Sequence, residues 1–232
     1  MADVFIIGDS HAGAIRNAFV SRGWNVCGGP IRAGKVFEQP FFEEHEGLIT
    51  FLDPVAQRNF SNALAKAGVT RVADLNMPVV ITLGFNSGRL AKVLSTRDAR
   101  FKSLEPPTWS RAVLEASVGA VKAAAVDFCK MLPAERTFAV LSPRRVRLRH
   151  LSLFDQIERI YADKLVALGI RIIDVADQTS DSAGLLREEF WSLRPDDRWH
   201  ANEAFASIVV DRIIQLCERE HAPDNVGQGV VS

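Results

Sequence analysis

The feature of this sequence that most constrains its fold is a series of short segments that are apolar on both alternating faces. A strand with one face in water alternates apolar and polar residues, whereas a strand buried on both faces is apolar almost throughout. Segments of the second kind occur at residues 4–7 and 79–83, and further short strands are predicted at residues 137–143 and 170–175. Stretches with helical apolar spacing separate them. This alternation predicts an α/β fold with a mostly parallel sheet that helices cover on both faces.

The helices are predicted from apolar residues at helical spacing and from the glycines that end them. After Ser10, an apolar stripe from Ala14 to Phe19 predicts a helix that ends before Gly23. Further helices are predicted at residues 57–67, 110–131, 152–168 and 202–219, and a short strand is predicted at 24–27. The periodicity therefore accounts for most of the chain.

Two stretches have weaker patterns. Residues 36–76 have no clear assignment outside the helix at 57–67, and the polar stretch 86–107 is predicted to be an irregular connection, a type that often carries function. In open parallel sheets, ligands bind beyond the carboxyl ends of the strands. Ser10, Asn86 and the loop at Pro143 each follow a predicted strand, so we expect them at one crevice.

Length and composition are those of a globular protein. The chain has 232 residues, which fits one domain over residues 1–232 with a frayed C-terminal tail at about residues 221–232. Hydrophobic residues make up 47% of the chain, enough for a full core. Lys plus Arg and Asp plus Glu are equal at 28 each, so no net field attracts nucleic acid or a membrane surface.

The N-terminus and the cysteines bear on localisation and cofactors. The apolar run before Gly8 is too short for a secretory signal, and no apolar stretch approaches the ~20 residues that span a bilayer. We therefore expect a cytoplasmic protein without membrane insertion. The spacing of Cys27, Cys129 and Cys217 suggests neither a disulfide framework nor a zinc site, and no metal or other cofactor is predicted.

The residues "GDSHAG" and "DDRWHAN" contain the candidate chemistry. A serine hydroxyl is a weak nucleophile at neutral pH, so it requires a nearby base and a third group that orients the base. Ser10 follows the first predicted strand, and Asp197 precedes His200 by three residues, a spacing that can place the carboxylate on the imidazole. Asn202 is a suitable N-cap for the last helix and would hold this loop in place.

Acyl transfer also requires donors for the oxyanion that forms on the carbonyl. The backbone N–H of Ser10 at the start of a helix is one candidate, and the side-chain amide of Asn86 is a second. The segment "GGPIRAG" supplies a third backbone N–H, from Gly34 or from Gly29. Gly34 is favoured.

These blocks, "GDSH", a loop glycine, "GFN" and "DRWH", resemble in content and order the SGNH, or GDSL-type, serine hydrolase family, in its GDSH subtype. The four letters of the family name would fall on Ser10, Gly34, Asn86 and His200, and the acid would be Asp197. The resemblance implies a flavodoxin-like three-layer α/β/α sandwich. It also implies an esterase, deacetylase, lipase or acyltransferase that uses a Ser-Asp-His triad without a metal.

The sequence departs from the commonest family pattern twice. His11 stands where Leu usually follows the serine, and the usual "GxND" reads "GFNS" from Gly84 to Ser87, without the final Asp. Neither change removes a group with a direct catalytic role.

Five further residues are candidates for substrate contact. Arg144 and Arg145 follow a predicted strand in "SPRRVRLRH" and could bind a carboxylate or phosphate, although the pattern favours a solvated surface turn. Trp199 could stack on a substrate or wedge the loop onto the core. Asp9 and His11 flank Ser10, and His11 is expected to have a structural or substrate-facing role.

The sequence favours a serine esterase or deacylase that forms an acyl-enzyme. The ester could be an O-acetyl or other acyl group on a carbohydrate or small molecule. An O-acyltransferase with the same triad is the first alternative, and a non-catalytic module that binds a glycan or a partner is the second. Substrate preference and oligomeric state stay open, because loops decide specificity on such folds.

Overall fold

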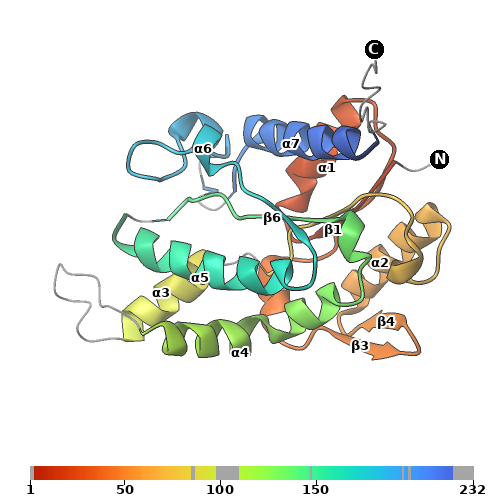
Figure 1. The fold of residues 1–232 in the computed structure, drawn as a ribbon, viewed down its shortest axis with the longest axis horizontal. Coiled ribbons are helices and arrows are strands. Elements are labelled where there is room, and N and C mark those ends of the chain that lie inside the picture. Colours follow the sequence, from red (N-terminus) through yellow and green to blue (C-terminus); the bar gives the residue numbers. More distant parts are fainter. Residues whose placement is uncertain are drawn as a thin grey trace, which may run out of the picture.

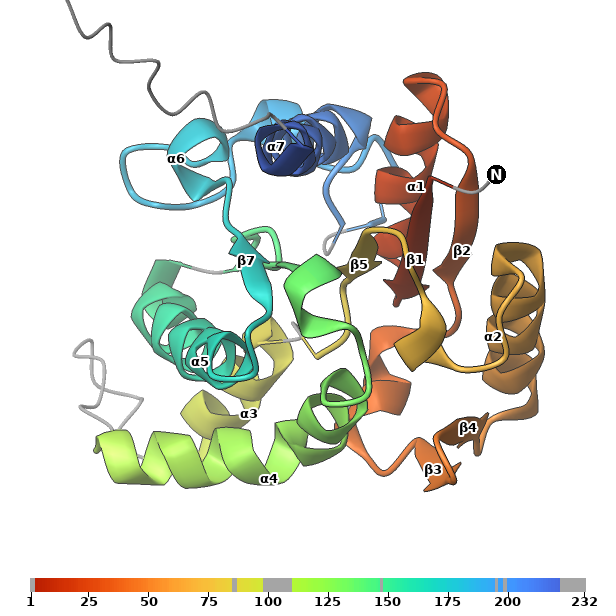
Figure 2. The same ribbon diagram turned by 45° about the vertical axis from the view of Figure 1, so that its right-hand side comes forward.

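A five-stranded parallel sheet organises the molecule in the computed structural model, which describes residues 3–84, 87–97, 110–146, 148–194, 196–197 and 200–221. The strands are ordered β2-β1-β5-β6-β7 (Figure 1 and Figure 2). They are β1 (Val4–Gly8), β2 (Val26–Pro30), β5 (Val79–Ile81), β6 (Thr137–Val140) and β7 (Arg171–Ile173), and all their pairings are parallel. The carboxyl ends of β1, β5 and β6 therefore lie at one edge of the sheet.

Helices cover both faces of this sheet, as Figure 2 shows. On one face lie α1 (Ala12–Ser21) and α7 (Glu203–His221), with the short α6 (Ala176–Thr179) nearby. On the other face lie α2 (Pro54–Ala67), α3 (Ser87–Arg97), α4 (Arg111–Cys129) and α5 (Leu148–Val166). The predicted three-layer α/β/α fold with a mostly parallel sheet is confirmed.

The core explains why the strands are apolar at successive positions. Phe5 and Ile7 of β1 point into one hydrophobic cluster with α2, α4 and α5, whereas Val4 and Ile6 point into a second cluster with α1 and α7. All four side chains are fully buried. A strand that supplies side chains to two cores has no polar position available, which is the pattern read from the sequence.

The second strand differs from its prediction at 24–27. It runs over Val26–Pro30 and includes Gly28 and Gly29, which had been assigned to a loop because glycine is common in turns. Gly28 has φ +80° and lies so close to the carbonyl oxygen of Ile6 that a Cβ would collide with it. Here glycine permits close strand contact.

The stretch expected to be irregular contains a helix. Residues Ser87–Arg97 form α3, and Leu90, Ala91 and Leu94 provide the apolar spacing that packs it against the core. The many polar residues between them obscured this spacing. Residues 98–109 lie outside the described part of the chain.

A small hairpin in the unassigned region 36–76 was also missed. It consists of β3 (Phe42–His45) and β4 (Leu48–Phe51), which pair antiparallel. The remaining elements are 3₁₀ turns at Gly34–Glu38 (η1), Val72–Asp74, Ala134–Arg136 and Glu188–Phe190. Among the described helices, none combines the length and apolarity required to cross a bilayer. The single-domain assignment and the cytoplasmic location stay predictions.

Candidate active site

Ser10 lies in the tight turn between the end of β1 and the start of α1, and its side chain is exposed. The buried Asp9 braces this turn. Its Oδ1 accepts hydrogen bonds from the backbone N–H of His11 at 2.9 Å and from the Thr82 hydroxyl at 3.1 Å. The Thr82 hydroxyl in turn accepts the N–H of Asp9 at 3.2 Å. Asp9, a candidate substrate contact, is only 5% exposed and holds the turn in shape.

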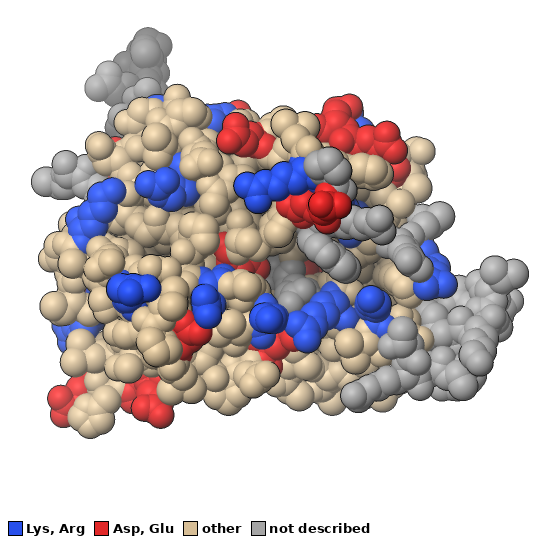
Figure 3. All heavy atoms as spheres, turned by 180° about the vertical axis from the view of Figure 1, so that it is seen from behind, with Lys and Arg blue, Asp and Glu red and all other residues tan. Residues whose placement is uncertain are grey.

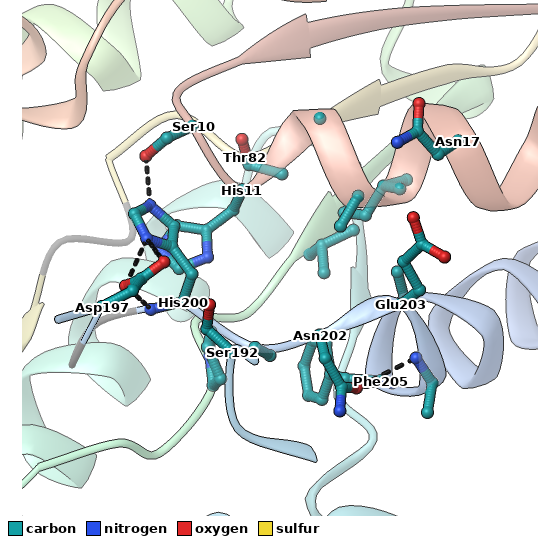
Figure 4. Close-up of a pocket in the computed structure, with 18 of the residues that line it drawn as sticks. Ser10, His11, Asn17, Thr82, Ser192, Asp197, His200, Asn202, Glu203 and Phe205 are labelled. Carbon is teal, nitrogen blue, oxygen red and sulfur yellow. Dashed lines mark hydrogen bonds and ion pairs between the residues drawn. The ribbon is translucent and has the colours of Figure 1, made fainter. Parts of the chain in front are cut away.

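The structure places Ser10, His200 and Asp197 in one hydrogen-bonded row (Figure 4). His200 Nε2 lies 2.6 Å from Ser10 Oγ. On the other side of the ring, Nδ1 lies 2.8 Å and 2.9 Å from the two carboxylate oxygens of Asp197. Asp197 Oδ1 also accepts the backbone N–H of His200 at 3.1 Å. A hydroxyl, an imidazole and a carboxylate in this order can activate the hydroxyl for nucleophilic attack.

Arg145 supports the loop that carries His200. Its guanidinium donates a hydrogen bond to the carbonyl oxygen of His200 at 2.8 Å and lies over the Trp191 ring, 4.9 Å from the centroid. The N–H of Ser192 donates to the same carbonyl at 3.1 Å. Spacing alone could not reveal this role, because the contact joins segments 55 residues apart.

Arg144 is also bound within the protein. Its guanidinium pairs with Asp155 at 3.1 Å and lies 3.7 Å from Asp174. Arg144 and Arg145 were candidates for binding an anionic substrate group, but in this structure both guanidinium groups contact protein atoms. Intramolecular contacts therefore account for the two arginines.

Asn202 anchors the other end of the loop. Its Oδ1 accepts the N–H groups of Ala204 and Phe205, at 3.0 Å and 3.2 Å, which is the N-cap predicted for the last helix. Its Nδ2 donates to the carbonyl oxygen of Glu189 at 2.6 Å. The cap thus ties the start of α7 to the chain that leads into the loop.

His11 contacts the base, which the sequence did not predict. The centroids of the His11 and His200 rings are 4.7 Å apart, and Figure 4 shows the two rings side by side. Burial lowers the pKa of His11, Asp9 opposes this, and His200 lowers it further. The net shift favours a neutral His11 beside the base. The sequence does not fix where the turn ends and α1 begins, so it could not orient this ring.

Of the two candidate glycines, Gly34 is the one beside the Ser10 turn. A Cβ on Gly34 would lie 2.8 Å from Asp9 Oδ2, so η1 begins directly against the residue that precedes Ser10. Gly29 is paired with Ile7 within the sheet. The other oxyanion candidate, Asn86, and the candidate substrate contact Trp199 lie outside the described residues.

A cavity of about 770 Å³ adjoins the hydrogen-bonded row. Ser10, His11 and His200 line one end of it. The rest is lined by residues of α1, the start of α7, the end of β6 with the loop after it, and residues 192–194. Within the described ranges, no three His, Cys, Asp or Glu side chains come together as metal ligands.

No protein family model matches the chain, and no curated protein matches its sequence. Solved structures do match. The chain is similar to an extracellular lipase from Streptomyces rimosus, with a TM-score of 0.50, 12% identity and coverage of 93% of this chain and 99% of that one. It is also similar to a lipase/acylhydrolase from Enterococcus faecalis, with a TM-score of 0.48, 13% identity and coverage of 94% and 97%.

A third similar structure is an active-site mutant of a family two carbohydrate esterase from Clostridium thermocellum, with a TM-score of 0.45, 13% identity and coverage of 94% of this chain and 64% of that one. At such low identity, the match to the Streptomyces rimosus lipase establishes the fold alone. That fold is the one implied by the resemblance to SGNH hydrolases.

Proposed function

We propose that this chain, which has the SGNH hydrolase fold, is a serine esterase that works through an acyl-enzyme. The observation that supports this most directly is the continuous row from Ser10 Oγ through His200 to Asp197, with 2.6 Å and 2.8 Å between neighbouring groups. The row sits at the carboxyl edge of a parallel sheet and opens onto a cavity.

In the proposed reaction, Ser10 Oγ attacks the ester carbonyl while His200 Nε2 takes the hydroxyl proton. Asp197 keeps the remaining proton on Nδ1 and stabilises the imidazolium. His200 then gives its proton to the leaving alcohol, which departs and leaves an acyl group on Ser10. A water molecule, deprotonated by His200, releases the acid and restores the serine.

The oxyanion would form beside Ser10, at the carboxyl end of β1. The backbone N–H groups of Ser10 and Gly34 and the side-chain amide of Asn86 are the proposed donors. His11 assists indirectly, because a neutral ring next to His200 avoids a second positive charge while the imidazolium exists. If an alcohol replaces water in the second step, the same residues catalyse O-acyl transfer.

The decisive test is hydrolysis of p-nitrophenyl acetate by the native protein and by Ser10→Ala. The variant should lose at least about 10³-fold in kcat, because no other group can form the acyl-enzyme. Ser21→Ala is the matched control, since Ser21 donates to the carbonyl oxygen of Ala18 at the far end of α1.

A fluorophosphonate probe should label Ser10, as peptide mapping can establish. Equal rates for the native protein and Ser10→Ala, with no label on any residue, would rule out the mechanism and favour a non-catalytic binding module. A label on another residue would rule out Ser10 as the nucleophile.

A further inference from the structure

The cavity beside Ser10 continues as a groove between α1 and the start of α7 (Figure 4). On the α1 side, Ser10, Gly13, Ala14 and Asn17 line it. Gly13, Ala14 and Asn17 lie on one side of the helix, because Asn17 follows the other two at spacings of four and three residues, and Ser10 lies in the turn just before the helix. At 1.5 Å per residue, the helical wall of the groove is about 6 Å long from Gly13 to Asn17.

The groove has an apolar floor. Ala14 of α1 belongs with Phe205 of α7 and Val140 of β6 to the hydrophobic cluster on this face of the sheet, and all three line the groove. The small side chain of Ala14 leaves space in the groove beside Ser10. The floor can therefore cover the apolar face of a ring.

The far end and rim are polar. Figure 4 shows the side chains of Asn17 and Glu203 facing each other from the two helices. Both are exposed, and neither makes a hydrogen bond or ion pair with another described residue. Ser192 and Arg194 add polar groups along the rim. An amide offers a donor and an acceptor, and a carboxylate accepts from hydroxyl groups, so this end suits neighbouring hydroxyls.

The position of the groove indicates which part of an ester would occupy it. Gly34 leads into η1, whose Phe37 packs in the cluster on the opposite face of the sheet from Ala14 and Phe205. The oxyanion donor and the groove are therefore on opposite sides of Ser10. His200, which would protonate the leaving oxygen, lines the groove. A leaving alcohol next to His200 Nε2 would extend into it.

We propose that the groove binds the alcohol part of the substrate and that this alcohol is polyhydroxylated, a sugar unit that carries the ester. The assignment rests on the proposed esterase function. The apolar floor contacts the C–H face of the sugar, and Asn17 and Glu203 bind its hydroxyl groups. A fatty acyl chain would match the apolar floor, but burying the carboxylate of Glu203 against its apolar end would cost free energy.

The kinetic test compares acetylated xylobiose with p-nitrophenyl acetate. Asn17→Ala, Glu203→Gln and Ala14→Leu should each lower kcat/KM for the sugar ester about tenfold more than for p-nitrophenyl acetate, mainly through KM. Glu218→Gln is the control, because Glu218 is exposed on α7 far from the groove. Equal losses on both esters would overturn the assignment. So would a selective loss of p-nitrophenyl octanoate turnover in Ala14→Leu, which would assign the groove to the acyl chain.

A binding test separates this inference from the proposed chemistry. Xylobiose should bind to the Ser10→Ala protein, as measured by NMR titration, and the double variant Ser10→Ala/Ala14→Leu should not bind it. Xylobiose binding without any ester turnover would support the groove and contradict the esterase function. Turnover of p-nitrophenyl acetate together with no detectable xylobiose binding would support the esterase function and contradict the groove assignment. Binding is tested up to 100 mM xylobiose, about the weakest affinity of interest.

Discussion

At the scale of single residues, the site depends on contacts between backbone turns and side chains from distant elements. Gly84 follows β5 with φ +81° and lies against Tyr161, whose hydroxyl donates to the Leu83 carbonyl oxygen at 3.0 Å. A Cβ on Gly84 would collide with that hydroxyl. Tyr161 of α5 thus holds the turn that leads toward Asn86.

Gly84→Ala should therefore destabilise the protein by roughly 3 kcal/mol, because it combines backbone strain with a steric clash in the core. Gly23→Ala is the matched control. Gly23 has the same φ of +81° but nothing within 4 Å of the added methyl group, so it should lose only about 1 kcal/mol. Urea denaturation measures both free energies of unfolding, and equal losses would refute the role of Tyr161.

Single residues also differ in how far the sequence predicts them. Ser10, Asp197 and His200 were predicted as the reacting groups because acyl transfer requires these residue types near strand and helix ends. The contacts of His11 with His200 and of Arg145 with the His200 carbonyl depend on side-chain direction and on loop packing. The spacing of residues in the sequence predicts neither side-chain direction nor loop packing.

At the scale of elements, α7 connects stability to the site. Asn202 caps this helix and also holds the chain at Glu189, so it constrains the loop between them, which carries His200. Asp53 caps α2 in a similar way, with its Oδ1 accepting from Val55 and Ala56, but far from this loop. The two caps therefore differ in one respect: only Asn202 adjoins the loop that carries His200.

Asn202→Ala and Asp53→Ala should each destabilise the protein by about 1 kcal/mol, the usual effect of losing an N-cap. Only Asn202→Ala should also lower kcat for p-nitrophenyl acetate, several-fold, because the imidazole then loses part of its support. Thermal denaturation and steady-state kinetics measure the two effects. A kcat loss of the same size in Asp53→Ala would mean that general stability, and not the loop, explains the result.

Elements with strong periodicity were predicted within a few residues, as for α4 and α5. The errors occurred where a local rule competed with tertiary packing. Polar residues hid the apolar spacing of α3, and the glycines of β2 suggested a loop although they allow strands to approach closely.

At the scale of the whole molecule, opposite charges balance, and Figure 3 shows both signs distributed over one face. Two ionisable groups of opposite charge are buried in neighbouring helices. Lys122 of α4 is 1% exposed and Glu158 of α5 is 5% exposed. Burial lowers the pKa of Lys122 to about 8, opposed by Glu158, and burial raises the pKa of Glu158 to about 8, opposed by Ser87 and Lys122.

These shifts predict how stability changes with pH. Between the unfolded and folded pKa values of Glu158, the folded state binds more protons, so stability falls as the pH rises toward 8. Above pH 8 the unfolded state retains the Lys122 proton longer, so stability rises again. The difference in unfolding free energy between the native protein and Lys122→Met/Glu158→Gln should therefore have its minimum near pH 8.

Denaturant titrations from pH 5 to 10, a range about centred on that minimum, would measure this difference. Lys130→Met/Asp127→Asn is the control, because it removes an exposed pair on the same helix. The difference in unfolding free energy between the native protein and this control variant should change little from about pH 5 to 10, since neither group is buried. A flat profile for the buried pair as well would contradict the assigned burial of its charges.

The sequence by itself predicted the architecture, which the structure confirms, and the groups of the candidate site. Two-sided apolar strands have to be buried on both faces, and a serine nucleophile needs a base and an acid, so local composition was sufficient for both. Tertiary structure alone decided that Gly34, and not Gly29, lies against the Ser10 turn, that Arg144 and Arg145 bind protein atoms, and that Asn17 faces Glu203. These outcomes depend on distances between segments that are far apart in the chain. The packing of the two hydrophobic cores sets those distances.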